Sequence, residues 1–167
     1  MDIGFSEWQR AGYPVTREVI RGERQAESAI ADSSGADLTP TFKSKINQAI
    51  RADADYIKTK QTGPSVVIID ARTPQEHFAA RIPNSMLDNW EEGLGFGQGG
   101  VMIKSKYELE THFREKGIAK DNEIICYCHV GIRASHKYLQ FKQAGYVRVK
   151  VYDGSIVDWA QRRNPLR

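Results

Sequence analysis

This sequence is poor in cysteine, has no long apolar run and carries little net charge. Two cysteines among 167 residues are too few for the disulfide scaffold of a small secreted protein. No apolar stretch approaches the roughly 18 residues of a membrane span, and the first ten residues, MDIGFSEWQR, lack the basic and apolar regions of a signal peptide. The net charge of +3 is spread along the chain without a basic stripe. We therefore expect a soluble protein with neither nucleic acid nor a membrane as a partner, and we favour the cytoplasm slightly over the periplasm.

The two cysteines point to neither a disulfide nor a metal site. Cys126 and Cys128 are two positions apart, so on a strand both side chains would face the same way, and a bridge between them would strain that strand. A zinc site needs about four ligands, and only His129 and His136 lie near in the sequence. We expect no metal and no cofactor, and we expect Cys126 to pack inside a sheet.

Apolar strands alternate with helical patterns along most of the chain. The predicted strands are residues 65–70 (SVVIID), 124–128 (IICYC) and 148–153 (RVKVYD), with a weaker one at Met86–Leu87. Strands that are apolar throughout are typical of a parallel sheet covered on both faces. The predicted helices are residues 74–80 behind a Thr-Pro cap, 105–117 with a capping box and a glycine stop, and 133–145. This alternation predicts an α/β fold with a mainly parallel sheet.

Other segments have weaker patterns. Residues 42–60 predict one more amphipathic helix or two short ones, residues 93–100 a flexible loop, and residues 21–40 a polar linker. In the helix at 133–145 the predicted buried side chains are Ala134, Tyr138, Leu139 and either Phe141 or Lys142.

The two ends of the chain resemble each other. When Trp8 is placed on Trp159, a shift of 151 residues, Pro14 falls on Pro165. A shift of that size is about one domain; chance similarity between two short segments is the alternative. We expect residues 1–41 to be the tail of a preceding repeat plus a linker, and residues 42–167 to be one domain.

The loop CHVGIR follows a predicted parallel strand and opens a predicted helix, which is where ligands bind in such sheets. Successive backbone N–H groups in a tight turn form an anion-binding nest, and the start of the helix adds its positive end. Gly131 permits the backbone conformation that such a turn needs. The nest would stabilise the thiolate of Cys128, which is the nucleophilic form of the side chain, and Arg133 could bind an oxyanion. The alternative is that Cys128 is simply a small buried apolar side chain.

Three segments in a fixed order resemble the rhodanese family. They are VVIIDARTPQEHFAARIPNS at 66–85, IICYCHVGIRASH at 124–136 and GYVRVKVYDGSIVDW at 145–159, and the resemblance covers about residues 42–163. It implies a rhodanese-like α/β fold with a central, mainly parallel five-stranded sheet and helices on both faces. It also implies that this chain is the C-terminal domain of a tandem rhodanese protein.

The resemblance implies a thiosulfate sulfurtransferase without a cofactor. Cys128 would take a sulfane sulfur from thiosulfate or a similar small anionic donor, hold it as a persulfide and pass it to cyanide or a thiol. Arg72 matches the Asp-X-Arg strand end of the family and would brace the active loop or add positive potential near it; a purely structural ion pair is the alternative. The residues that would contact substrate in the loop are His129, Val130, Gly131, Ile132 and Arg133.

The loop departs from the best-known members of the family. His129 and Val130 match neither the Arg-Lys pair of thiosulfate enzymes nor the Gly-Ser or Gly-Thr pair of mercaptopyruvate enzymes. The latter also place an arginine near the position of Glu76, where a carboxylate would repel the carboxylate of that substrate. We therefore expect thiosulfate as the donor. His129 is either a proton donor or anion contact, or an exposed side chain without a role. We expect ordinary surface or packing roles for His77, His112, His136 and Trp159.

Two other functions are open. Cysteine phosphatases and arsenate reductases are the first, but the protein phosphatases have five residues between the cysteine and the arginine, and four separate Cys128 from Arg133. A shorter loop forms a smaller anion-binding site, which suits one sulfur atom better than a phosphoryl group. The second is a non-catalytic or sulfur-carrier domain that binds an acceptor protein; the presence of Cys128 argues against a non-catalytic domain.

Overall fold

The computed structural model describes residues 5–17, 45, 47–97 and 100–167. The chain divides into two compact units, Met1–Ile46 and Asn47–Arg167. The described part of the first unit holds one short helix, α1 (Phe5–Arg10). The predicted linker at 21–40 lies outside the described residues.

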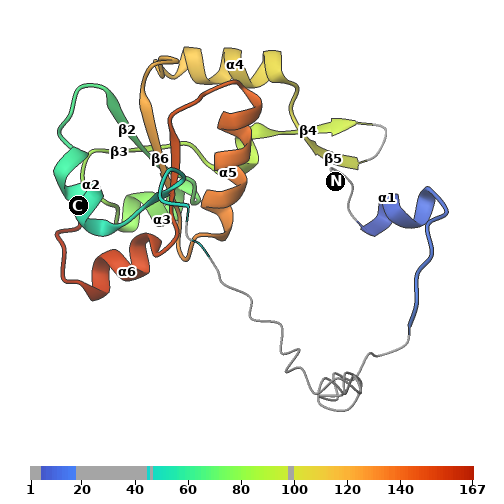
Figure 1. Ribbon diagram of the computed structural model, residues 1–167, viewed down its shortest axis with the longest axis horizontal. Coiled ribbons are helices and arrows are strands. Elements are labelled where there is room, and N and C mark those ends of the chain that lie inside the picture. Colours follow the sequence, from blue (N-terminus) through green and yellow to red (C-terminus); the bar gives the residue numbers. More distant parts are fainter. Residues whose placement is uncertain (1–4, 18–44, 46, 98–99) are drawn as a thin grey trace, which may run out of the picture. The chain divides into compact units, whose positions relative to one another are not determined.

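The second unit is built on a five-stranded parallel sheet (Figure 1). The strand order is β1-β7-β6-β2-β3, and every neighbouring pair is parallel. The strands are β1 (Arg51–Ala52), β2 (Val66–Asp70), β3 (Ser85–Leu87), β6 (Glu123–Tyr127) and β7 (Val149–Tyr152). The α/β fold with a parallel central sheet is confirmed, and so are the strands predicted at 65–70, 86–87, 124–128 and 148–153.

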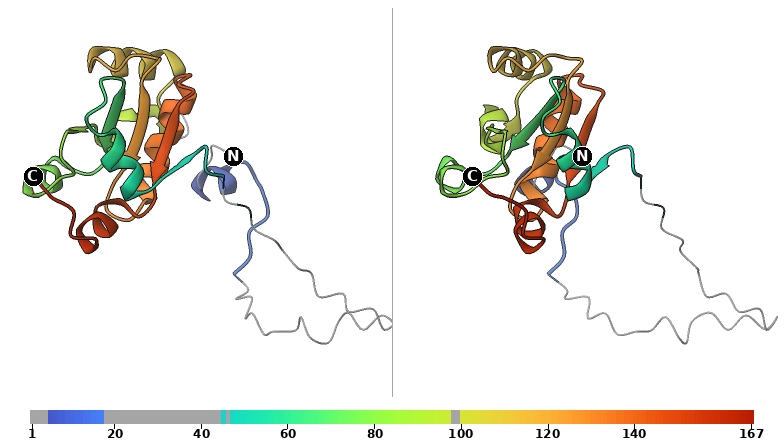
Figure 2. Two further views of the ribbon diagram at one scale, coloured as in Figure 1. Left: turned by 60° about the vertical axis from the view of Figure 1, so that its left-hand side comes forward. Right: turned by 90° about the vertical axis from the view of Figure 1, so that its left-hand side faces the viewer.

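Helices cover both faces of the sheet (Figure 2). Side chains alternate along β6: Ile124 and Cys126 enter one apolar core, while Ile125 and Tyr127 enter the other. The first core is closed by α4 (Lys106–Glu115) and α5 (Ile132–Gln143), the second by α2 (Ala54–Lys60) and α6 (Ser155–Gln161). Because both faces are buried, the central strand β6 is apolar from Ile124 to Cys126, between Glu123 and Tyr127.

The predicted helix starts are present in detail. Helix α3 (Pro74–Ala79) begins after Thr73, whose side chain accepts the Glu76 N–H while the Glu76 carboxylate accepts the Thr73 N–H. Ser105 and Glu108 make the same capping box at α4. Two reciprocal hydrogen bonds therefore satisfy N–H groups that the first turn of each helix leaves free.

One predicted element is wrong, and another is confirmed only in part. Residues 93–100, expected to be a loop, contain β4 (Leu94–Gly97), which pairs antiparallel with β5 (Gly100–Ile103). The glycine-rich sequence did not indicate this hairpin, because pairing with another strand does not depend on side-chain periodicity. Within the described residues 47–60 the helical pattern holds for α2, whereas Arg51 and Ala52 form β1 and pair with β7. The part before residue 47 lies mainly outside the described residues.

The predicted buried face of α5 is partly wrong. Ala134 and Phe141 are buried, but Leu139 is 53% exposed, and Lys137 and Gln140 are buried in its place. Both polar side chains reach carbonyl groups near η2 (Trp90–Gly93): Lys137 contacts the Asn89 oxygen at 3.3 Å and Gln140 the Trp90 oxygen at 2.6 Å. The buried face of α5 therefore includes polar side chains that have hydrogen-bond partners, which a pattern of apolar residues does not identify.

The two similar ends of the chain share their local hydrogen bonds. The indole N–H of Trp8 donates to the Pro14 oxygen at 3.0 Å, and that of Trp159 donates to the Pro165 oxygen at 2.8 Å. Each tryptophan carbonyl accepts from the backbone N–H five residues later, at 3.2 Å in both segments. A short helix and its C-terminal turn therefore occur twice, 151 residues apart.

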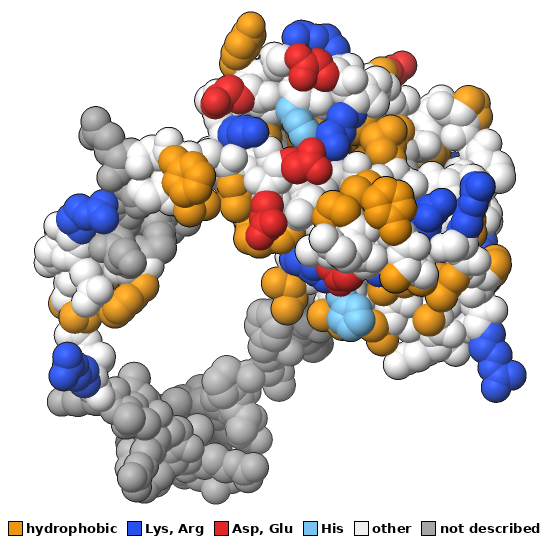
Figure 3. Space-filling view, turned by 180° about the vertical axis from the view of Figure 1, so that it is seen from behind, with side chains coloured by type: hydrophobic (Ala, Val, Ile, Leu, Met, Phe, Trp, Pro, Cys, Tyr) orange, Lys and Arg blue, Asp and Glu red, His pale blue; other side chains and the backbone are white. Residues whose placement is uncertain are grey.

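Among the described residues, no helix is both long enough and apolar enough to cross a bilayer. Figure 3 shows acidic and basic side chains intermingled on the face seen from behind.

Candidate active site

Cys128 lies directly after β6, at the carboxyl edge of the sheet, and its side chain is 1% exposed. The chain then turns through Gly131, the N-cap of α5, whose φ is +92°. A Cβ atom on Gly131 would lie 2.7 Å from the backbone oxygen of Asp153. Both the left-handed backbone and the close approach require glycine at this position.

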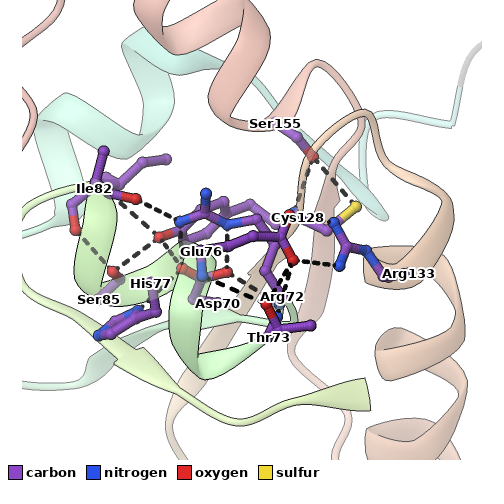
Figure 4. Close-up of polar contacts among 12 residues, drawn as sticks. Asp70, Arg72, Thr73, Glu76, His77, Ile82, Ser85, Cys128, Arg133 and Ser155 are labelled. Atoms are coloured by element: carbon purple, nitrogen blue, oxygen red, sulfur yellow. Dashed lines mark hydrogen bonds and ion pairs between the residues drawn. The ribbon is translucent and has the colours of Figure 1, made fainter. Parts of the chain in front are cut away.

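Hydrogen bonds from two parts of the chain hold Cys128 in place, and Figure 4 shows those between Cys128 and Ser155. The Gly131 N–H donates to the Cys128 sulfur at 3.2 Å, and the Cys128 N–H donates to the Ser155 hydroxyl at 3.0 Å. The Ser155 proton goes to the Tyr152 carbonyl at 2.8 Å, and its oxygen lies 3.9 Å from the sulfur. The sulfur thus faces a backbone donor, and the loop is tied to the start of α6.

Ser155 was not among the residues predicted for the site. It is fully buried, and its φ is +53°, a left-handed conformation that is strained for a residue with a Cβ atom. The surrounding contacts must supply the energy that keeps it there. The sequence signal was the DGS segment after the predicted strand at 148–153, at the same sheet edge as Cys128.

Arg133 is paired with a carboxylate. Its two terminal nitrogens donate to the two oxygens of Glu76 at 2.6 and 2.7 Å (Figure 4). These hydrogen bonds are the main reason why the pKa of the Glu76 carboxyl falls to about 2, with backbone and side-chain bonds from Thr73 adding to the effect. The pKa of Arg133 is raised, chiefly by Glu76 and to a smaller extent by Cys128. Glu76 therefore joins the start of α3 to the active loop.

Arg72 is held by another carboxylate. It donates to Asp70 at 2.9 and 2.6 Å and to the Ala80 oxygen at 2.7 Å. Burial disfavours its charge, but the hydrogen bonds and charge of Asp70 outweigh that cost and raise its pKa. Within the described residues these contacts do not include the loop at 128–133, so the arrangement is that of a structural ion pair.

The Asp70 carboxylate has further partners. The His77 ring lies 2.9 Å from it and the Tyr127 hydroxyl donates to it at 2.8 Å. His77 is therefore neither a surface residue nor simple packing. Trp159 packs in the core, as expected, and is fully buried.

The other side chains of the loop face outward. His129 is exposed, Val130 is 52% exposed and Ile132 is 78% exposed. They form a rim of one imidazole and two apolar groups that a substrate or a partner would meet. Cys126 points into the core, where burial raises the pKa of its thiol.

A second polar cluster centres on the buried Asp88. Its carboxylate lies 2.8 Å from the His112 ring, 3.2 Å from Lys116 and 2.7 Å from Lys137. Burial opposes its charge, but the His112 hydrogen bond and the two ammonium groups lower its pKa. Asp88, Glu92 and His112 bring ligand atoms within 4.8 Å of one another and could hold a metal ion, although two lysines already neutralise the site. His112 is part of this network rather than an ordinary surface residue.

Fold and site together define an α/β domain that presents a cysteine at the carboxyl edge of a parallel sheet. A sequence model described as "Rhodanese-like domain" matches residues 53–162. The chain belongs to the rhodanese-like domain family.

Curated relatives carry names from sulfur chemistry. The sulfur carrier protein TtuD of Thermus thermophilus is 29% identical over 95% of this chain and 57% of its own length. Thiosulfate sulfurtransferase of Mus musculus is 29% identical over 97% of this chain and 52% of its own length. The chain spans about half the length of these relatives. The names of both relatives refer to sulfur chemistry, which supports sulfur transfer at the level of the family.

Solved structures support the fold. The wild-type structure of EanB superposes with a TM-score of 0.74 at 19% identity, covering 99% of this chain and 39% of that one. The crystal structure of the anaerobic ergothioneine biosynthesis enzyme from Chlorobium limicola has the same TM-score and identity and covers 99% of this chain and 40% of that one.

Proposed function

We propose that this domain transfers a sulfane sulfur through a persulfide on Cys128, with thiosulfate or a similar small anion as the donor. The observation that carries the proposal is the backbone N–H of Gly131 directed at the Cys128 sulfur at 3.2 Å, at the edge of the sheet where ligands bind. A backbone N–H group is a hydrogen-bond donor that is already in position, so it stabilises an anionic sulfur without having to reorganise during the reaction.

The reaction has two steps. The Cys128 thiolate attacks the outer sulfur of thiosulfate; a new S–S bond forms, the donor S–S bond breaks, and sulfite leaves with the electron pair. Cyanide or a thiolate then attacks the terminal sulfur of the persulfide, and the Cys128 thiolate is regenerated. Such a scheme gives ping-pong kinetics. The thiolate and the persulfide are both anionic, so a loop with the Gly131 N–H directed at the Cys128 sulfur suits both states.

A sulfur-carrier role is the second candidate, in which a protein thiol accepts the sulfur. Two observations favour it: the exposed Val130 and Ile132 beside Cys128 offer apolar surface to a partner, and one relative is named a sulfur carrier protein. Phosphoryl chemistry is less favoured, because Arg133, which would hold phosphoryl oxygens, is paired with Glu76.

We also propose that residues 1–41 are the closing segment of a preceding rhodanese-like repeat plus a linker, and that the domain begins near residue 42. The shared hydrogen bonds of Trp8 and Trp159 support this. The alignments with two relatives, over 95% and 97% of this chain, also extend well beyond the matched domain at 53–162.

Mass spectrometry after incubation with thiosulfate tests the sulfur-transfer proposal. We expect one sulfur atom to be gained on Cys128, lost on adding cyanide with release of thiocyanate, and absent in Cys128→Ser. Cys126→Ala is the matched control and should still gain the sulfur. Phosphate release from an aryl phosphate without any gain of sulfur would favour the phosphatase, and no modification with either reagent would favour a binding domain.

A further inference from the structure

The positive charge of the active loop is cancelled by a neighbouring carboxylate. In the loop from Cys128 to Arg133, the basic side chains are His129 and Arg133. Both terminal nitrogens of Arg133 are bound to the two oxygens of Glu76, which is ionised throughout the neutral range. The pair therefore has no net charge, and its facing atoms already satisfy each other.

The guanidinium of Arg72 is also paired with a carboxylate. Arg72 is bound through two hydrogen bonds to the buried carboxylate of Asp70. The outer side of the loop presents the exposed His129 together with two apolar side chains, Val130 and Ile132. The hydrogen bond to the Cys128 sulfur comes from the Gly131 N–H, which carries a partial charge, and the full charge of Arg133, which also interacts with Cys128, is offset by Glu76.

The net charge around Cys128 determines how readily an anionic sulfur donor can approach the Cys128 thiolate. Thiosulfate is a dianion, and it must come into contact with an anionic sulfur; a free guanidinium would offset the repulsion, whereas a guanidinium paired with a carboxylate offsets little of it. Resting on the proposed function, we infer that Glu76 is a specificity-determining residue. It makes Cys128 select sulfane-sulfur donors that carry less negative charge than thiosulfate, namely thiosulfonates or organic persulfides. It acts through Arg133 rather than on the reacting atoms.

Methanethiosulfonate is the probe that isolates charge. It carries a methyl group in place of one anionic oxygen of thiosulfate, so its charge is −1 and its sulfane sulfur is retained. The Cys128 thiolate attacks that sulfur, the donor S–S bond breaks, and methanesulfinate leaves with the electron pair. The total charge is −2 before and after the step, and the product on the protein is the same persulfide as with thiosulfate.

The experiment compares kcat/KM for the two donors in the wild type and in Glu76→Gln. The glutamine amide oxygen can still accept from Thr73, but the charge of Arg133 is no longer cancelled. We expect kcat/KM to rise roughly tenfold with thiosulfate and roughly threefold with methanethiosulfonate, because a new unit charge acts twice as strongly on a dianion. The wild-type rate with thiosulfate should rise as salt is added, because salt screens the repulsion between the thiolate and the dianion, whereas the variant rate should change less.

Glu108→Gln is the matched control. Glu108 makes the same capping box with Ser105 at the start of α4, and it is not paired with an arginine in the described structure. It should leave the ratio of the two donors and the salt dependence unchanged. If Glu76→Gln folds poorly, the salt profile and the donor preference of the wild type still test the inference, since both are measured without a substitution.

The outcomes separate the inference from the proposed function. Both donors loading Cys128, with a ratio that Glu76→Gln shifts toward thiosulfate, supports the inference. An unchanged ratio, or a wild-type rate with thiosulfate that falls as salt is added, overturns it and leaves sulfur transfer intact. Failure of both donors to load Cys128 in either protein overturns the proposed function and the inference together.

Discussion

A Cβ atom on Gly131 would lie 2.7 Å from the backbone oxygen of Asp153, so the active loop and the turn before α6 are in contact through bare backbone. Gly131→Ala must push this contact apart and also hold a left-handed φ. We expect a loss of about 2–4 kcal/mol of unfolding free energy and a large loss of persulfide formation. Urea unfolding and the thiosulfate assay measure the two effects.

Gly117→Ala is the control for that substitution. Its φ is +76°, but nothing lies within 4 Å of the position of its Cβ atom, so only the backbone strain of about 1 kcal/mol is expected, with activity retained. Equal losses in the two variants would show that the contact with Asp153 has no importance.

Ser155→Ala removes the acceptor of the buried Cys128 N–H. An unpaired buried donor costs about 1–3 kcal/mol, and the loop that carries the nucleophile should lose its fixed position, so we expect lower kcat/KM with every donor. Ser155→Gly also removes the acceptor but relieves the φ of +53°, and it should be the more stable of the two. Retention of full activity in both variants would contradict a role for the Cys128–Ser155 bond.

Asp70→Asn breaks the charge balance of a buried network. Arg72 would stay buried without a counter-charge, and Tyr127 and His77 would lose an ionised acceptor; we expect a loss of about 3–5 kcal/mol in unfolding free energy. Asp153 pairs with Arg51 on the surface, so Asp153→Asn should cost at most about 1 kcal/mol. Similar values for the two variants would be evidence against the structural ion pair at Arg72.

The contribution of the Glu76–Arg133 pair to stability should be lost in acid. The pKa of Glu76 is lowered from 4.5 to about 2 in the folded protein, so below its unfolded pKa the unfolded chain binds more protons than the folded one. Its stabilisation is complete above about pH 4.5 and is lost as the pH falls toward about 2. Thermal unfolding across this range should show a smaller loss for Glu76→Gln than for the wild type. Glu115→Gln, which changes the same charge at an exposed site, should follow the wild type.

The two tryptophans test the proposed repeat. Trp159 is fully buried in the domain core, so Trp159→Ala should cost about 3–5 kcal/mol. If residues 5–17 belong to another repeat, Trp8→Ala should leave the unfolding of the domain at 47–167 unchanged. Denaturant unfolding followed by circular dichroism provides the comparison, and a matching loss in Trp8→Ala would argue that the first segment is part of this domain.

Local sequence patterns determined the strands at 66–70, 123–127 and 149–152, the Thr-Pro start of α3, the capping box of α4 and the loop that starts at Cys128. Each depends on residues close together in the chain: an unbroken apolar run, a Thr-Pro pair, a Ser three residues before a Glu, or a glycine where the backbone turns. These signals do not depend on what the segment packs against.

Only the tertiary structure decided which side chains from distant parts of the chain contact each other. Glu76, Arg133 and Ser155 come from three separate helices. Glu76 contacts Arg133 and Ser155 contacts Cys128, because the carboxyl ends of parallel strands share one edge of the sheet. The same holds for the errors: Arg51–Ala52 became a strand by pairing with β7, and Lys137 turned inward to reach Asp88. Contacts between distant segments follow from topology and charge compensation, which a local pattern does not encode.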